Sequence, residues 1–402
     1  MSLARRLGLP EQTAVPVSLA VLFYVGHLVC AGWIASSEVF ALASIVTCGY
    51  CLQRGLLKTS FHILYYPLAL FAVVSSLSAI AAPRSIHSFG ENALWLKILL
   101  FPTALILFRE VSGSRGVAIR AFLFFGVFSS TFGLIQYFAL GQRDLDHRIT
   151  GPAAHVMTLS GLLVPVALLA LTLWIHDRKN GWLALVTILT TFALLITFTR
   201  SAWLGWLVAV AVLLISKRPR LLIWATPLAL LALSLMPLSV FGRMASSFDT
   251  RQSSNLDRIR MFEAGVEMIK DYPLLGVGPA NVKEIYPLYR KHDAPRFRIP
   301  HLHNNLVQLW AERGVLAPVA YLLLLALFLR ECFRGWSGTA SRYAEAGVAV
   351  AVGLSAAGVF EFNFGDTEVF WALLDVMAIV VTALEAARPN EVVPEPVGEL
   401  RS

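Results

Sequence analysis

Long apolar stretches, separated by short polar breaks, recur along almost the whole sequence and constrain its fold more than any other feature. A helix that crosses a membrane needs about 20 mostly apolar residues. About twelve stretches of this kind can be identified, so we expect an all-α, polytopic membrane protein with about twelve transmembrane helices. The expected spans are Ala14–Ala35, Glu38–Leu52, Phe61–Ala81, Ala93–Phe108, Val117–Leu140, Ala153–Ile175, Trp182–Phe198, Ala202–Ile215, Leu221–Phe241, Asn305–Leu329, Tyr343–Phe362 and Val369–Ala387.

The composition agrees with this expectation. Of 402 residues, 57% are hydrophobic and 14% are charged, whereas a soluble domain carries roughly 25% charged residues. The net charge of +8 would suggest a nucleic-acid partner in a soluble protein. Here most Lys and Arg lie in the breaks between apolar stretches, so we expect membrane lipids and no nucleic acid as partners.

Basic residues in the breaks predict the orientation, because cytoplasmic loops carry an excess of Lys and Arg. One set of alternate breaks, which includes both tails, holds about 17 Lys and Arg. The other short breaks hold about four, namely Arg84, Arg143, Arg148 and Arg200. Both termini are therefore expected in the cytoplasm, which requires an even number of spans.

A long polar segment, residues 242–304, divides the chain. We expect transmembrane helices in 1–241 and 305–387, a polar cytoplasmic tail in 388–402, and the long segment as a loop on the outer face. The loop is basic, but long loops translocate largely regardless of charge, so its charge does not contradict a position on the outer face. A basic loop on that face predicts an acidic partner there. Within it, apolar residues at helical spacing predict an amphipathic helix: Leu256, Ile259, Phe262, Val266 and Ile269.

Three arginines could bind an anion at this face. Arg200 lies between two apolar helices, where an arginine is costly unless it is paired or hydrated. Its guanidinium could donate bidentate hydrogen bonds to a phosphate, or the side chain could reach the lipid headgroups. Arg258 and Arg260 begin the loop helix on different faces. Arg258 is the better anion ligand, and a solvated charge is favoured for Arg260.

Two histidines, His301 and His303, precede the tenth expected span. They are a poor metal pair, because neither a Cys nor a carboxylate lies near them in the sequence. His303 could instead accept a proton near neutral pH or contribute to a helix cap with Asn304. Beyond it, Asn305, Gln308 and Glu312 form a polar stripe on the outer end of the span. Such stripes usually face a bundle interior or a hydrated cavity.

A last polar group lies in the outer turn between the final two spans. It contains Glu361, Asn363, Asp366 and Glu368, which could brace the basic residues or form an ordinary acidic loop. Together, the Arg200 break, the loop helix and the His303 segment predict a basic site with one candidate base at the outer interface. A lipid that carries a diphosphate could reach this site from the side.

Three motifs resemble those of the O-antigen ligase and polymerase superfamily, the membrane glycosyltransferases of the GT-C class. The first is Thr199-Arg-Ser-Ala-Trp203. The second is Arg258-Ile-Arg-Met-Phe262, followed by Asp271-Tyr-Pro-Leu-Leu-Gly-Val-Gly-Pro279, with Phe262 where Trp is usual. The third and most specific is His303-Asn-Asn-Leu-Val-Gln308 with Glu312 and Gly314.

The resemblance implies transfer, without metal or cofactor, of a glycan from undecaprenyl diphosphate to lipid A-core oligosaccharide at the periplasmic face of the bacterial inner membrane. His303 would be the general base, and Arg200 and Arg258 would bind the diphosphate. Further candidate substrate-binding residues are Arg260, His301, Asn304, Gln308 and Glu312.

The span count and the single large loop favour a ligase, and other functions remain open. O-antigen polymerases and protein O-oligosaccharyltransferases of the same superfamily share the donor and differ in the acceptor. A flippase or exporter of lipid-linked glycans, which is a different class, could also use basic residues around a diphosphate. We would expect its charges at mid-span on both sides of the bilayer, and Lys97 is the sole basic residue at a mid-span position here.

Overall fold

The computed structural model of the protein describes residues 3–82, 97–142, 147–217 and 253–388, together with Ser88 and Asp144. Within these ranges the chain forms α-helices and no strands. The helices are α1 (Leu3–Arg6), α2 (Val15–Val29), α3 (Ile34–Gln53), α4 (Tyr65–Ala81), α7 (Leu100–Glu110), α8 (Ser114–Phe138), α9 (Val156–His176), α10 (Gly181–Ile196), α11 (Arg200–Lys217), α14 (Ser253–Asp271), α15 (Val282–Tyr289), α16 (Asn305–Arg313), α17 (Leu316–Arg334), α18 (Ser341–Ala357) and α19 (Thr367–Ala387).

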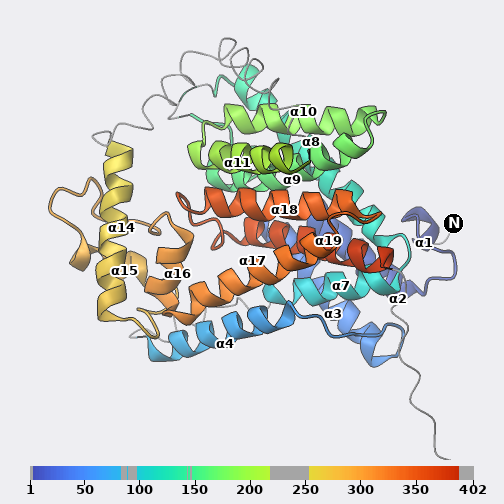
Figure 1. Ribbon diagram of the computed structural model, residues 1–402, viewed down its shortest axis with the longest axis horizontal. Helices are drawn as coiled ribbons and strands as arrows, with labels where there is room; N and C mark the ends of the chain where they lie inside the picture. The colour runs from blue at the N-terminus through green and yellow to red at the C-terminus, as the bar shows by residue number, and fades with distance from the viewer. Residues whose placement is uncertain are drawn as a thin grey trace, which may run out of the picture.

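Most of these helices form one bundle, drawn along the horizontal axis of Figure 1. Five described helices, α3, α8, α9, α17 and α19, are long and apolar enough to cross a membrane. The shorter apolar helices α2, α4, α10 and α11 also belong to the bundle, as do α7 and α18. In the described part of the chain this architecture is all-helical, as expected, and it is consistent with a multi-pass membrane protein. The expected span Leu221–Phe241 and the first part of Ala93–Phe108 lie outside the described residues.

The outer faces of the bundle are apolar. Val39 on α3 is 67% exposed, Ile80 on α4 is 61% exposed and Ile135 on α8 is 53% exposed. Apolar surface of this extent is unfavourable in water and normal where lipid tails are the solvent. By contrast, α19 lies inside the bundle, with almost its whole length buried among α7, α9, α17 and α18.

The tenth expected span, Asn305–Leu329, is two helices instead of one. α16 ends at Gly314, whose φ of +76° favours glycine, and α17 starts at Leu316. A Cβ on Gly314 would lie 1.8 Å from the carbonyl oxygen of Leu274, so the backbone of the polar segment at Leu274 packs directly against this break. The polar stripe therefore belongs to a short outer helix, and α17 alone has the length and composition of a span.

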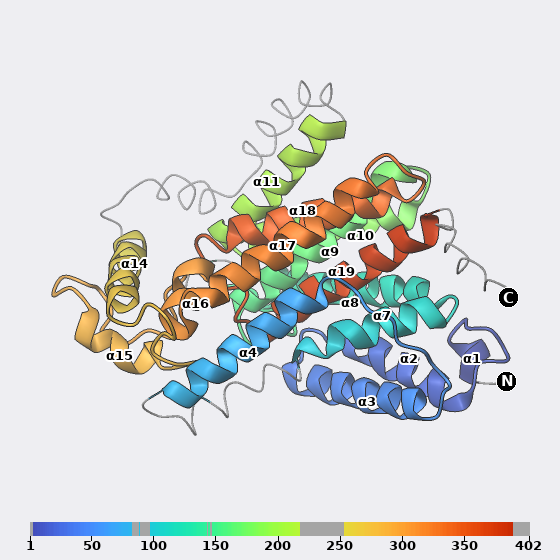
Figure 2. The ribbon, with the colours of Figure 1, turned by 60° about the horizontal axis from the view of Figure 1, so that its bottom comes forward.

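The polar segment folds against the end of the bundle opposite α1, as both ribbon views show (Figures 1 and 2). The amphipathic helix expected there is α14, and it lies across the bundle axis. Its buried face differs from the expected stripe: Met261, Ala264 and Met268 are buried, whereas Ile259 and Phe262 are exposed. Gly265 allows the close approach of α16, because a Cβ there would lie 2.5 Å from the Val307 side chain.

Candidate functional site

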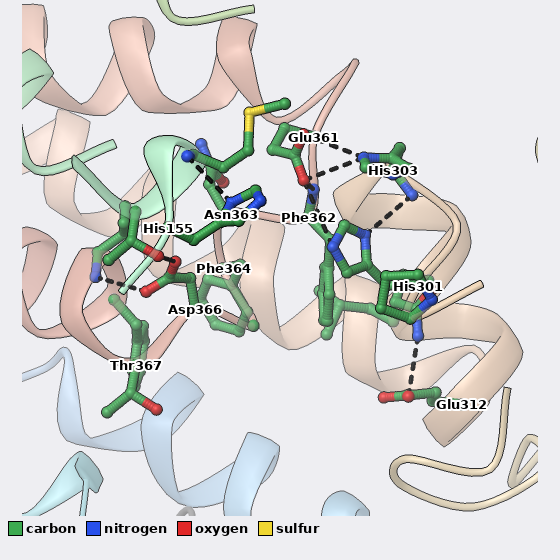
Figure 3. Close-up of a pocket in the computed structure, with 18 of the residues that line it drawn as sticks. His155, His301, His303, Glu312, Glu361, Phe362, Asn363, Phe364, Asp366 and Thr367 are labelled. Carbon is green, nitrogen blue, oxygen red and sulfur yellow. Dashed lines mark hydrogen bonds and ion pairs between the residues drawn. The ribbon is translucent and has the colours of Figure 1, made fainter. Parts of the chain in front are cut away.

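A cavity of about 800 Å³ lies where the polar segment meets the end of the bundle (Figure 3). Residues from all three motifs line it, as the sequence predicted. Its lining includes Arg200, Arg258, His301, His303, Gln308 and Glu312. The structure therefore brings α11, α14 and the start of α16 to one site.

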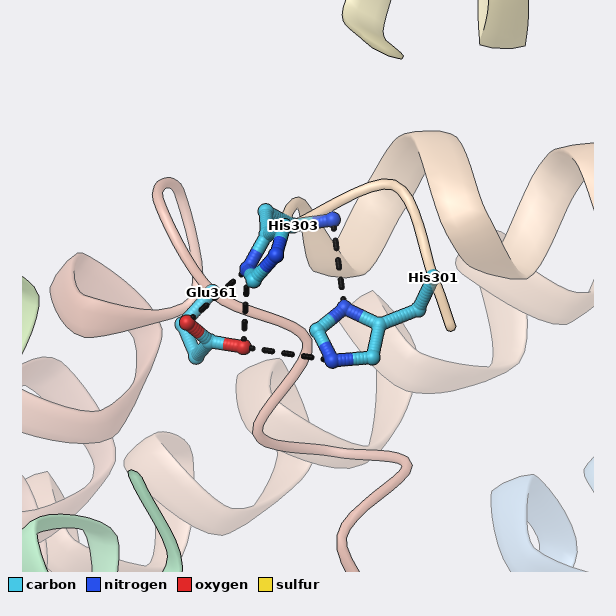
Figure 4. Close-up of side chains that lie close together, drawn as sticks. All are labelled: His301, His303 and Glu361. Atoms are coloured by element: carbon cyan, nitrogen blue, oxygen red, sulfur yellow. Dashed lines mark hydrogen bonds and ion pairs between the residues drawn. The ribbon is translucent and has the colours of Figure 1, made fainter. Parts of the chain in front are cut away.

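His303 is held by its backbone and by a carboxylate. Its φ of +52° lies in the left-handed region, which is uncommon for a residue other than glycine. The imidazole Nδ1 lies 3.0 Å from Oε2 and 3.1 Å from Oε1 of Glu361 (Figure 4). Because the carboxylate only accepts hydrogen bonds, Nδ1 carries the proton and Nε2 is left as the acceptor.

Glu361 is buried between its basic neighbours. Burial by itself would raise the pKa of this carboxyl group. The hydrogen bond from His303 and the electrostatic interactions with His303, His301 and Arg258 outweigh burial and lower the pKa to about 2. Glu361 is therefore ionised at neutral pH. The sequence prediction that this outer turn could brace the basic residues is confirmed for Glu361, whose Oε2 lies 3.9 Å from Nη2 of Arg258.

His301 lies directly beside His303, with 4.3 Å between the ring centres. Its Nδ1 accepts a hydrogen bond of 3.4 Å from the backbone N–H of His303, and its Nε2 lies 3.5 Å from Oε1 of Glu361. Burial, reinforced by the neighbouring His303, lowers the pKa of His301 to about 4. His301 is therefore neutral at neutral pH.

Arg200 and Arg258 reach the cavity from different helices. Nη2 of Arg200 donates to Oδ1 of Asn255 at 2.7 Å and to Oγ of Ser254 at 3.3 Å, so the first turn of α14 orients the guanidinium. Burial lowers the pKa of Arg258, yet an arginine keeps its charge in a protein. The cavity thus holds two cationic forks of the kind that bind phosphate oxygens.

Two of the candidate substrate-binding residues lie elsewhere. Arg260 pairs with Glu263 at 2.7 Å and Asp293 at 2.6 Å and is not part of the cavity lining. Arg260 thus lies on another face of α14, as expected, but it is part-buried and ion-paired instead of a solvated charge. Asn304 also lies outside the lining and caps α16, because its Oδ1 accepts from the backbone N–H of Val307 at 3.0 Å. Substrate binding by either residue stays a prediction.

Gln308 and Glu312 join the polar stripe of α16 to the adjoining loops. Gln308 accepts from the backbone N–H of Leu302 at 2.7 Å and donates to Glu312 at 2.8 Å. Oε1 of Glu312 also accepts from the backbone N–H of Ala280 at 3.1 Å. These bonds hold the segment before His303 and the turn that ends at Ala280 in place. Gln308 and Glu312 therefore position the cavity wall and also line the cavity.

Sequence reasoning did not assign to the site several basic residues that line the cavity: Lys97, Arg148, His155, Lys283, Arg296 and Arg313. Arg296 pairs with the buried Asp257 of α14 at 2.5 Å. Lys97, noted before as a mid-span charge, donates to Oγ1 of Thr367 at 2.5 Å. No local pattern marks these residues, because only the tertiary fold brings them to the site.

The structure corrects one argument about metals. We expected no carboxylate near the two histidines, since none lies near them in sequence. Glu361 fills that place, and His301, His303 and Glu361 each offer a ligand atom within 4.8 Å of the others. These three residues could therefore hold a metal ion.

These features define a multi-pass membrane protein with a basic cavity at one end of its helix bundle. Residues 184–322 match the family model described as O-antigen ligase. The match covers about a third of the chain and confirms the resemblance to the O-antigen ligase and polymerase superfamily, a group of membrane enzymes. It includes Arg200, Arg258 and His303, whereas Glu361 lies beyond it. No curated protein matches the chain.

Proposed function

We propose that this protein is an O-antigen ligase, which transfers a glycan from undecaprenyl diphosphate to lipid A-core oligosaccharide. One observation carries the proposal: His303, oriented by an ionised carboxylate, lines the same cavity as Arg200 and Arg258. A base beside two cationic forks suits an acceptor hydroxyl and a diphosphate leaving group.

In the proposed reaction, Nε2 of His303 takes the proton of the acceptor hydroxyl as its oxygen attacks the anomeric carbon of the donor. The bond from that carbon to the diphosphate oxygen breaks, and undecaprenyl diphosphate leaves with the electron pair. Glu361 then faces an imidazolium, whose positive charge it stabilises across the 3.0 Å contact. A positioned base of this kind typically contributes about 10²–10⁴-fold to the rate.

Arg200 and Arg258 act on the other substrate. As the glycosidic bond breaks, negative charge grows on the diphosphate, and guanidinium groups already in place stabilise it without reorganisation. The contact of Arg200 with Asn255 and that of Arg258 with Glu361 support this role, because each holds a fork in a fixed direction.

We place this site on the periplasmic face of the bacterial inner membrane, with both termini in the cytoplasm. The proposal rests on the distribution of Lys and Arg among the breaks. The structure adds that the polar segment and α1 lie at opposite ends of the bundle (Figure 2). A cavity at the polar end can receive the lipid carrier from the outer leaflet.

Transfer by purified protein tests the proposal. The donor is the carrier-linked glycan, and the acceptor is lipid A-core, a second carrier-linked glycan or a pilin-like protein. A chelator is present at millimolar concentration in each reaction. We expect product with lipid A-core and none with His303→Ala, while His292→Ala, an exposed loop histidine, serves as the matched control. Product with a second glycan alone would indicate a polymerase, and product with the protein alone an O-oligosaccharyltransferase. Movement of the carrier lipid across the bilayer without any transfer would indicate a flippase.

A further inference from the structure

The His301, His303 and Glu361 side chains have nearly the spacing that a zinc ion requires (Figure 4). Zinc binds His nitrogens and carboxylate oxygens at about 2.0–2.2 Å in a tetrahedron, which places neighbouring ligand atoms about 3.3 Å apart. Oε1 of Glu361 lies 3.1 Å from Nδ1 of His303 and 3.5 Å from Nε2 of His301. All three ligand atoms lie within 4.8 Å of one another, so rotation of the rings that shortens the longest of these distances would complete three of the four ligands.

The surroundings of these atoms also resemble those of metal ligands. Carboxylates and histidines that bind metals are usually held by further hydrogen bonds. Oε1 of Glu361 accepts from the backbone N–H of Phe362 at 3.3 Å, and Asn304 fixes the start of α16 next to His303.

We propose that a zinc-like divalent ion binds between His301, His303 and Glu361 and inhibits the enzyme. The inference rests on the proposed function, in which His303 is the base. A metal on Nδ1 of His303 takes the nitrogen that now holds the proton, so the proton moves through solvent to Nε2. That nitrogen then has no lone pair for the acceptor hydroxyl, and the same ion cancels the negative charge of Glu361.

Two features limit the affinity. Nη2 of Arg258 lies 3.9 Å from Glu361 and repels a cation. Binding through Nε2 of His301 moves its proton to Nδ1, which breaks the 3.4 Å hydrogen bond from His303. We therefore expect a dissociation constant in the micromolar range, which is weaker than that of a structural zinc site.

Binding of cobalt(II) chloride to the full chain in detergent, without a polyhistidine tag, tests the site independently of transfer. Cobalt replaces zinc in tetrahedral sites and shows visible absorption there. We expect one equivalent to bind and zinc to displace it. His301→Gln and Glu361→Gln should each raise the dissociation constant at least tenfold, while His292→Ala keeps the wild-type value. Absorption that persists in both cavity variants, or that is absent in wild type, overturns the proposal.

The inhibition is measured separately. Each variant is assayed for transfer relative to its own rate in chelator. Micromolar zinc should reduce the wild-type rate at least tenfold, chelator should restore it, and His301→Gln should need at least tenfold more zinc. If chelator abolishes transfer and zinc restores it, the inhibitory role is wrong. If cobalt fails to bind while transfer proceeds, the metal site is wrong and the proposed function stands.

Discussion

Nδ1 of His303 lies 3.0 Å from the Glu361 carboxylate, although 58 positions separate the two residues in sequence. Glu361 follows α18 and His303 precedes α16, so the contact joins the polar segment to the last pair of bundle helices. It assigns the donor role to Nδ1 and leaves Nε2 as the proton acceptor. The residue that orients the base therefore lies outside the motif that contains the base.

Removing the charge of Glu361 should slow transfer without removing the base. In Glu361→Gln the amide oxygen can still accept from Nδ1, but the imidazolium formed during reaction loses its counter-charge. We expect kcat to fall at least tenfold, with a loss no greater than that of His303→Ala. The measurement is the split between kcat and KM. Glu267→Gln on the exposed side of α14 is the control, and an unchanged kcat would exclude the orienting role.

The two histidines should differ in their effect. His303→Ala removes the base, so a loss of about 10²–10⁴-fold is expected. His301→Ala removes a neighbour whose pKa of about 4 makes it neutral and a poor proton acceptor near pH 7, so a loss below about tenfold is expected. Rates are compared at equal amounts of folded protein, because His303 directly precedes Asn304, the residue that caps α16, and its replacement could reduce the amount of folded protein. Equal losses in both variants would contradict a single base.

Stability should depend on pH through His301. Its pKa falls from 6.5 when unfolded to about 4 when folded, so its contribution to stability is complete above pH 6.5 and is lost as the pH falls toward 4. Glu361 loses its contribution only between pH 4.5 and about 2. Between pH 6.5 and 4.5, the thermal midpoint of His301→Ala should therefore fall less than that of wild type. Parallel curves would exclude protonation of His301 as the cause.

Much of this arrangement could be predicted from the sequence. Apolar length predicted a membrane bundle, and the motifs with Arg200, Arg258 and His303 predicted one basic cavity. Helical spacing also predicted α14, but part of its apolar stripe is exposed in the structure: Ile259 and Phe262 are exposed, whereas Met261 and Met268 are buried. Apolar periodicity does not record which partner covers a helix.

The remainder of the site depends on tertiary contacts. Gly314 lies at the break because a Cβ there would clash with the Leu274 backbone, and the sequence of α16 and α17 does not indicate that contact. Likewise, Glu361 reaches His303 through the packing of α18 beside α17. The sequence therefore predicted that Glu361 lies in the outer turn but not that it contacts His303. Spacing along a chain predicts neighbours on one helix and not across helices.

The orientation can be tested with introduced cysteines in a background without Cys30, which is only half-buried, whereas Cys48, Cys51 and Cys332 are buried. Lys291→Cys lies on the exposed polar segment, and Ser337→Cys lies in the exposed break after α17. A membrane-impermeant thiol reagent added to the periplasmic side should label Lys291→Cys and spare Ser337→Cys. The reverse labelling would place the cavity in the cytoplasm and contradict the donor proposed here.

Lysine variants of the arginines distinguish the contribution of bidentate geometry from that of positive charge. If Arg200 and Arg258 bind the diphosphate with their forks, lysine keeps the charge and loses the bidentate geometry. Arg200→Lys and Arg258→Lys should then lose nearly as much activity as the alanine variants, about tenfold or more. Arg260, which pairs with Glu263 and Asp293 outside the cavity, is the matched control and should tolerate lysine.

Donor binding completes this test, because the base acts on the acceptor and the forks act on the donor. Retention of the lipid-diphosphate glycan by purified protein should weaken at least tenfold in Arg200→Ala and Arg258→Ala, because these variants lose charge-assisted hydrogen bonds to the diphosphate. In His303→Ala, retention should stay within about twofold of the wild-type value. An Arg200 that only reaches lipid headgroups would be replaced by lysine without loss. Full donor retention in both alanine variants would remove the arginines from the diphosphate site and leave His303 with Glu361 as the remaining part of the proposed machinery.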